Sequence, residues 1–236
     1  MSYAIATHLT GDRRGRPYGF TLVELLVTVG LIAVIVGILI PVLGSARKTS
    51  SRVECGTRLR EIHRLTAIYL DRGNNLPPLN NNAGDSPYQY NYLIYDGANF
   101  ANCWGPLLSP YRSDPEDPKL FYCPVQTNEA FQFATPTNDW PIESGDGTAA
   151  GYARRFGLTG KTFTSISGTI AFASDLMHRP GLVESGHEDR VNVVFTDGHI
   201  ATVDDEILLN NTLGTPFDSL DDPIVEEIWK TFDRNP

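Results

Sequence analysis

Several features of common protein classes are missing from the sequence. It contains no Gly-x-Ser-x-Gly elbow, no phosphate-binding loop and no dinucleotide fingerprint, so it lacks these familiar catalytic frameworks. Basic residues are outnumbered, with 19 Lys and Arg against 28 Asp and Glu. Because nucleic-acid binding needs a basic face, this balance argues against nucleic acid as the main partner. We therefore expect neither an enzyme nor a nucleic-acid-binding protein.

Cysteine is also scarce, with only Cys55, Cys103 and Cys123 in the chain. There is no Cys-x-x-Cys pair and no Cys/His spacing typical of zinc, so we assign no metal ligands. No cofactor is expected, and calcium stays open without assigned residues because no loop has convincing ligand spacing. Three thiols allow three alternative disulfides. Since Cys103 and Cys123 both lie in the loop-rich part, we expect these two to pair in an oxidising compartment.

Charge is absent from residues 25–43, where the only helix breakers are Gly30, Gly37 and Pro41. About 20 apolar residues, rising roughly 1.5 Å each, span the hydrocarbon of a bilayer. Glu24 stands directly before this run, one turn inside the start of the predicted helix. A carboxylate in hydrocarbon is costly, which favours a functional reason for its presence. The stretch predicts a single membrane-spanning helix with one acid, Glu24, near its start.

A polar, basic segment, residues 1–19, precedes the apolar run. A secretory signal carries its apolar core before the cut, whereas a cut between Gly19 and Phe20 retains the helix. The run Gly-Phe-Thr-Leu-Val-Glu at 19–24 resembles the leader junction of type IV pilins and type II secretion pseudopilins. Pro41 stands where many pilins carry a proline. The resemblance implies cleavage by prepilin peptidase after Gly19, N-methylation of Phe20 and incorporation of the helix into a filament.

The resemblance also implies an assembly role for Glu24. The methylated amine of Phe20 stays cationic, and in a medium of low dielectric it stabilises the Glu24 carboxylate of a neighbouring subunit. Such pairing would set the axial register of successive subunits. The alternative is that Glu24 only reaches the lipid headgroups from the helix start. The same resemblance places the leader in the cytoplasm and the body outside the inner membrane.

The predicted fold is α+β and pilin-like, with one long helix packed on a small antiparallel sheet and loop-rich insertions. Residues 20–43 form the transmembrane and assembly helix, 44–73 a helical stem, and 74–236 the extracytoplasmic body. Apolar residues of the stem recur at spacings of three and four, which predicts a buried stripe. The stripe consists of Cys55, Leu59, Ile62, Thr66 and Tyr69.

The body contains two predicted strands, at 165–174 and 191–195. Asp197-Gly198 has the composition of a two-residue hairpin turn, which predicts a return strand at 199–203. The tail from Leu220 has apolar residues at helical spacing. It predicts a short amphipathic helix docked on the body or on a partner.

His187 is followed by nine residues and then by Asp197-Gly198. This spacing, in the region 187–198, resembles the motif of a prepilin-associated domain family of planctomycete-type bacteria. His187 and Asp197 would then be ligands or an acid–base pair, or His187 would hold its loop against the turn by a hydrogen bond. We favour the structural role because Asp-Gly is a sufficient turn signal by itself.

Two functions follow from these patterns. The first is a structural subunit of a type II secretion pseudopilus or type IV pilus-like filament. Its partners would be prepilin peptidase, other pilin subunits and the inner membrane, which it crosses once. The second is a membrane-tethered module that binds a glycan, a peptide or Ca²⁺ outside the cytoplasm. Acidic loops and tyrosines motivate the second. The tyrosines are Tyr88, Tyr90, Tyr92 and Tyr95.

Overall fold

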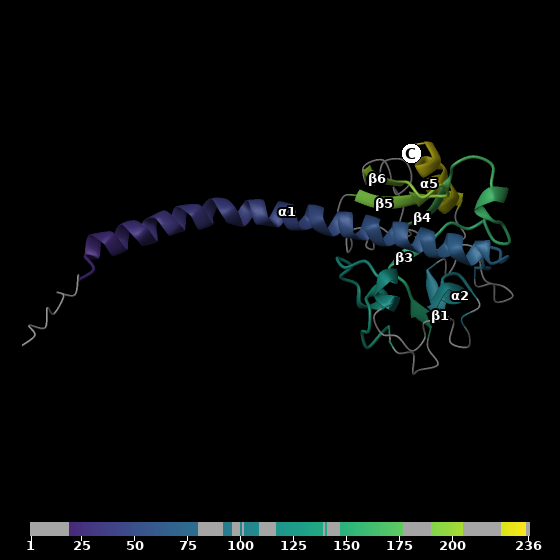
Figure 1. The fold of residues 1–236 in the computed structure, drawn as a ribbon, viewed down its shortest axis with the longest axis horizontal. Coiled ribbons are helices and arrows are strands. Elements are labelled where there is room, and N and C mark those ends of the chain that lie inside the picture. Colours follow the sequence, from purple (N-terminus) through teal and green to yellow (C-terminus); the bar gives the residue numbers. More distant parts are fainter. Residues whose placement is uncertain are drawn as a thin grey trace, which may run out of the picture. The chain divides into compact units, whose positions relative to one another are not determined.

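The structure is a computed structural model, and it divides into two units, Met1–Ala46 and Arg47–Pro236, which we describe separately (Figure 1). The helix α1 (Leu22–Asp71) begins in the first unit and ends in the second. The described residues are 19–79, 92–95, 100, 102–108, 117–138, 140, 147–176, 190–204 and 223–234. Apart from Gly19, the predicted leader lies outside them.

Helix α1 has the extent that the sequence predicts, from Phe20 to about Arg72. It ends where Gly73 takes up a positive φ of 84° and donates its N–H to the Leu70 carbonyl at 3.0 Å. A left-handed glycine satisfies the last carbonyls in this way and stops the helix. Pro41 lies inside α1 without ending it. As a proline it lacks the N–H that would have bonded the Gly37 carbonyl, and its ring crowds that carbonyl.

The two parts of α1 have different surroundings. Within the first unit, every large apolar side chain from Phe20 to Leu43 is between 44% and 78% exposed. Within the second unit, one face of α1 is buried. The buried residues are Cys55, Gly56, Leu59, Ile62, Thr66 and Leu70. This confirms the predicted stripe except at its end, where Leu70 rather than Tyr69 completes the buried face.

The described part of the body contains two antiparallel sheets, in agreement with the α+β prediction. The first pairs β1 (Leu93–Tyr95) with β2 (Thr148–Ala149). The second has four strands in sequence order. They are β3 (Tyr152–Arg154), β4 (Ala171–Asp175), β5 (Arg190–Phe195) and β6 (Ile200–Asp204). Where the body is described, its helical elements are α2 (Gly105–Leu108), η2 (Asp117–Phe121), η3 (Glu129–Phe131), η4 (Phe163–Ser165) and α5 (Pro223–Arg234).

The strand predicted at 165–174 starts later than expected. Ser165, the first residue of the predicted strand, ends the 3₁₀ turn η4, which Thr162 and Ser165 close with reciprocal side-chain to backbone hydrogen bonds. Gly168 then has a positive φ of 78°, which no extended strand accommodates. Only from Ala171 does the chain pair with its neighbours.

The four-stranded sheet has a helix on each face (Figure 1). Phe172 and Val194 belong to the core that contains Leu59 and Ile62 of α1. Alternate residues of β5 face the other way and pack against α5. That second core consists of Ala171, Val191, Val193, Phe195, Val203, Ile228, Trp229 and Phe232. The predicted C-terminal helix is thus confirmed, and it docks on the body.

The β5–β6 hairpin is present, but its turn differs from the predicted one. The Phe195 N–H donates to the His199 carbonyl at 3.0 Å, and the Gly198 N–H donates to the Phe195 carbonyl at 2.9 Å. The loop therefore has three residues, from Thr196 to Gly198. Gly198 alone among them has a positive φ, of 87°, whereas a two-residue Asp-Gly turn of type I′ needs two. The turn is type I, closed by a left-handed glycine.

Gly198→Ala should destabilise the body for two reasons. The positive φ costs a non-glycine residue roughly 1 kcal/mol, and an added Cβ would lie 3.1 Å from the His63 ring. Gly157→Ala is the matched control, since Gly157 has a φ of +76° but no atom within 4 Å of its added Cβ. Urea unfolding of the detergent-solubilised chain should show a larger loss for Gly198→Ala. Equal losses would contradict the steric role of His63.

Candidate processing and assembly site

The start of α1 is closed by a pair of reciprocal hydrogen bonds between Thr21 and Glu24. The Glu24 N–H donates to Thr21 Oγ1 at 3.2 Å, and the Thr21 N–H donates to Glu24 Oε2 at 2.9 Å. The Thr21 hydroxyl also donates to Oε2, at 2.7 Å. This is the arrangement of a capping box, which satisfies backbone donors that have no partner within the helix.

The capping box gives Glu24 a local role that the sequence interpretation missed. Its signal was present in the sequence, since Thr-x-x-Glu directly before an apolar run is typical of a helix start. Both bonds to Thr21 use Oε2. Among the described residues, no bond to Oε1 accompanies them, so that oxygen is available to a donor from another molecule.

Gly19 and Phe20 lie just outside the helix, in exposed chain. Phe20 is 72% exposed, and no atom lies within 4 Å of the position of a Cβ on Gly19. A peptide bond in exposed, non-helical chain is accessible to a peptidase. Beyond it, α1 is long and apolar enough to cross a membrane, by length and composition.

The second sequence motif lies at the β5–β6 turn, and only half of it is described. His187 lies outside the described residues. Asp197 accepts the His199 N–H at 3.1 Å, and its Oδ1 is 2.6 Å from the ring Nδ1 of His199. Burial raises the pKa of the Asp197 carboxyl, but these hydrogen bonds outweigh it, so that pKa lies below its usual value. The contacts explain Asp197 as a turn residue, and the role of His187 stays a prediction.

A histidine of the stem holds this turn from the other side. His63 Nε2 lies 3.0 Å from the Thr196 carbonyl. A carbonyl only accepts hydrogen bonds, so this nitrogen carries the hydrogen. The His63 ring stacks on Phe163 with the centroids 4.7 Å apart. Sequence reasoning missed this residue, because nothing in the spacing relates α1 to a turn so far along the chain.

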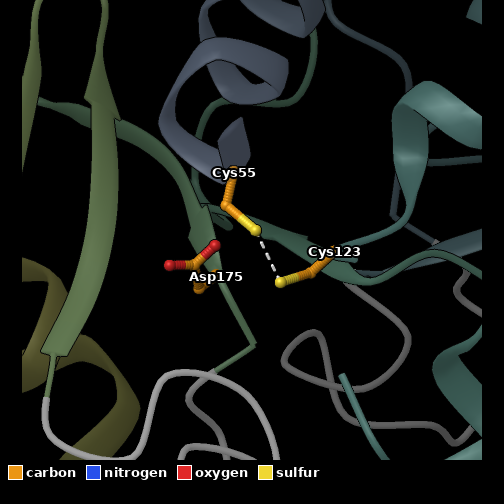
Figure 2. A group of neighbouring side chains, drawn as sticks. All are labelled: Cys55, Cys123 and Asp175. Carbon is orange, nitrogen blue, oxygen red and sulfur yellow. Dashed lines mark hydrogen bonds between the residues drawn. The ribbon is translucent and has the colours of Figure 1, made fainter. Parts of the chain in front are cut away.

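The cysteines are arranged differently from the expected pairing. Cys55 Sγ and Cys123 Sγ are 2.7 Å apart in the buried core, with Asp175 beside them (Figure 2). Cys103 is buried in the same core, and its N–H donates to the Pro78 carbonyl at 2.8 Å. None of the three forms a disulfide. The predicted Cys103–Cys123 bond is therefore absent, because the α1 stripe brings Cys55 to Cys123 instead.

The described tyrosines of the predicted binding module are half-buried, and each contacts another aromatic ring of the body. Tyr92 meets the Phe131 ring edge-on at a centroid distance of 5.1 Å. Tyr95 contacts Phe100 at 5.0 Å. Tyr88 and Tyr90 lie outside the described residues. Tyr92 and Tyr95 thus pack against aromatic side chains of neighbouring segments, Phe131 and Phe100.

Comparison with known proteins identifies the N-terminal segment. Residues 14–40 match a family model described as the prokaryotic N-terminal methylation motif. The chain carries a prepilin-type methylation motif. No curated protein and no solved structure gave a match to the chain. The motif supports a type IV pilin-like protein, a substrate of prepilin processing that one N-terminal helix anchors in the membrane.

Thr21→Ala should loosen the first turn of α1 without changing its apolar surface. Losing an N-cap side chain costs about 1 kcal/mol, which corresponds to roughly fivefold faster amide exchange. Hydrogen exchange of the micelle-bound chain should show this increase at Val23 and Glu24. Thr28→Ala is the control, since Thr28 bonds only the Leu25 carbonyl within α1. Unchanged exchange at Val23 and Glu24 would contradict the capping box.

Proposed function

We propose that this chain is a structural subunit of a type II secretion pseudopilus or a type IV pilus-like filament. Prepilin peptidase cuts it after Gly19, the new amine of Phe20 is methylated, and the N-terminal helix then joins the filament core. The observation that carries the proposal is the start of α1. There a prepilin-type motif adjoins an apolar helix that its own unit leaves exposed.

The exposed apolar surface requires an apolar surrounding both before and after assembly, because leaving it in water is costly. Burying a large apolar side chain contributes about 1.5–3 kcal/mol. The stretch from Phe20 to Leu43 presents such side chains on all sides of the helix. A bilayer covers them before assembly, and packed helices of neighbouring subunits cover them afterwards. The same residues thus serve as an anchor and as an interface.

Glu24 makes the register between subunits specific in an interface that is otherwise apolar. Its Oε2 is held by Thr21 of the same chain, which leaves Oε1 for the methylated amine of a neighbour's Phe20. An ion pair in low dielectric discriminates strongly between correct and shifted registers, because an unpaired charge there is expensive. Pro41 allows the helix to bend within the packed core. The body then lies outside the inner membrane.

The processed N-terminus is the first expected outcome. Mass spectrometry of the chain extracted from its native membrane should find a first peptide that begins with N-methylated Phe20. Gly19→Val should block the cut by placing a branched side chain at the junction, and this variant should keep Met1 and the unmodified leader. An intact leader in the unsubstituted chain, or a cut after Leu43, would overturn the proposal.

Two variants separate the assembly role of Glu24 from its capping role. Glu24→Gln keeps a side chain that completes a capping box but removes the charge, whereas Thr21→Ala keeps the charge and removes the box. Removing one partner of a buried ion pair costs about 3–5 kcal/mol. Filaments sheared from cells and pelleted should therefore fall more than 100-fold for Glu24→Gln and only slightly for Thr21→Ala. The reverse order would make Glu24 a cap only.

A further inference from the structure

Cys55 and Cys123 join two elements that are far apart in the sequence. Cys55 is the first buried residue of α1, and Cys123 follows the 3₁₀ helix η2. Their sulfurs face each other at 2.7 Å, as the dashed line in Figure 2 shows. A covalent S–S bond is about 2.05 Å long, so forming it requires a movement of less than about 1 Å.

The backbones around the two sulfurs are held together independently of them. Arg58, one turn after Cys55, donates from Nη1 to the Lys119 carbonyl at 2.7 Å and to the Tyr122 carbonyl at 2.5 Å. The chain that leads to Cys123 is also held by the body, because the Gly151 N–H donates to the Phe121 carbonyl at 2.8 Å. The approach of α1 to Cys123 is therefore built into the fold.

A metal would fit the same three side chains less well. Cys55, Cys123 and Asp175 offer ligand atoms that all lie within 4.8 Å of one another. Two thiolates bound tetrahedrally to zinc at about 2.3 Å each are roughly 3.8 Å apart, which exceeds the 2.7 Å between these sulfurs. The geometry is closer to a covalent bond than to a chelate.

We propose that Cys55 and Cys123 form a disulfide that ties the stem of α1 covalently to the body. The proposal rests on the proposed function only in placing the body in an oxidising compartment. Cys103 is buried in the same core, but the contact between Cys55 and Cys123 leaves it outside the proposed bond. Because Cys55 begins the buried stripe, the bond joins stem and body where α1 first becomes buried. A pull on the helix within a filament would be transmitted to the body through it.

The bond forms by two thiol–disulfide exchanges with a disulfide-bearing oxidant. One cysteine thiolate attacks the oxidant and forms a mixed disulfide, and the second thiolate displaces the reduced oxidant, which leaves as a dithiol. The two cysteines lose two protons and two electrons in total. Burial, the contact with Cys123 and the nearby Asp175 raise the pKa of the Cys55 thiol. Exchange therefore precedes closure of the core during folding.

The test maps the cysteines in the full chain extracted from membranes, with N-ethylmaleimide added before lysis. Digestion without reductant should give one cross-linked pair of peptides, containing Cys55 and Cys123 and lighter by two hydrogen atoms than the reduced pair. Cys103 should be found as a thiol, alkylated only after unfolding. Reduction should lower the Tm of the solubilised chain by an amount on the order of 10 °C.

The variants make the thermal result specific. Cys103→Ala should keep both the cross-linked peptides and the response to reductant. Cys55→Ala with Cys123→Ala should start at a lower Tm and no longer respond to reductant. A bridge that contains Cys103 would overturn the proposal, and so would a chain that retains zinc on both thiols.

The same digest separates this proposal from the proposed function. A methylated Phe20 with alkylated Cys55 and Cys123 would overturn the disulfide and leave the filament role standing. An intact leader with the cross-linked peptides present would do the opposite. If the leader is intact and the thiols are reduced, the chain is refolded with oxidised glutathione, and failure to link Cys55 to Cys123 overturns the disulfide as well.

Discussion

The apolar side chains in the first part of α1 are not covered by the rest of their own unit. The rest of the structure depends on this constraint. The side chains from Phe20 to Leu43 stay largely exposed, which in water would forfeit tens of kcal/mol at about 1.5–3 kcal/mol each. A bilayer or the helices of other subunits must therefore surround this stretch. Farther along, α1 changes its pattern from apolar on all sides to a single stripe, and there the body covers it.

Glu24 and its capping threonine show how the constraint is met at the helix start. In hydrocarbon, a backbone donor without a partner costs several kcal/mol, and a lone charge is also expensive. The Thr21–Glu24 capping box treats both problems locally, because the carboxylate accepts from Thr21 and the Thr21 hydroxyl accepts from the helix backbone. The remaining carboxylate oxygen is then free to select a neighbour. A cap and a pairing group are thus compatible roles of one residue.

Periodic features were predictable from the sequence, and features set by distant contacts were not. The long helix and its buried stripe follow from spacing, and the β5–β6 hairpin follows from the Asp-Gly signal between two apolar runs. The helix and the hairpin are confirmed, and the stripe is confirmed except at Tyr69. The late start of β4 depends on Gly168, and the type of the hairpin turn depends on the backbone of Asp197 and Gly198. The partner of Cys123 depends on how the stem docks, which no local pattern encodes. Within the candidate site, the Gly19–Phe20 junction was recognisable from the sequence. The Thr21 cap also had a sequence signal, Thr-x-x-Glu, but it was missed.

The central claim is that Glu24 of one subunit pairs with the amino terminus of another. A helical reconstruction of isolated filaments by electron cryomicroscopy, at a resolution that shows side chains, tests it most directly. The account predicts the methylated nitrogen of Phe20 within about 4 Å of a neighbouring subunit's Glu24 carboxylate, the usual limit for an ion pair. A filament in which Glu24 contacts only its own Thr21, with every neighbouring amine farther away, would contradict it.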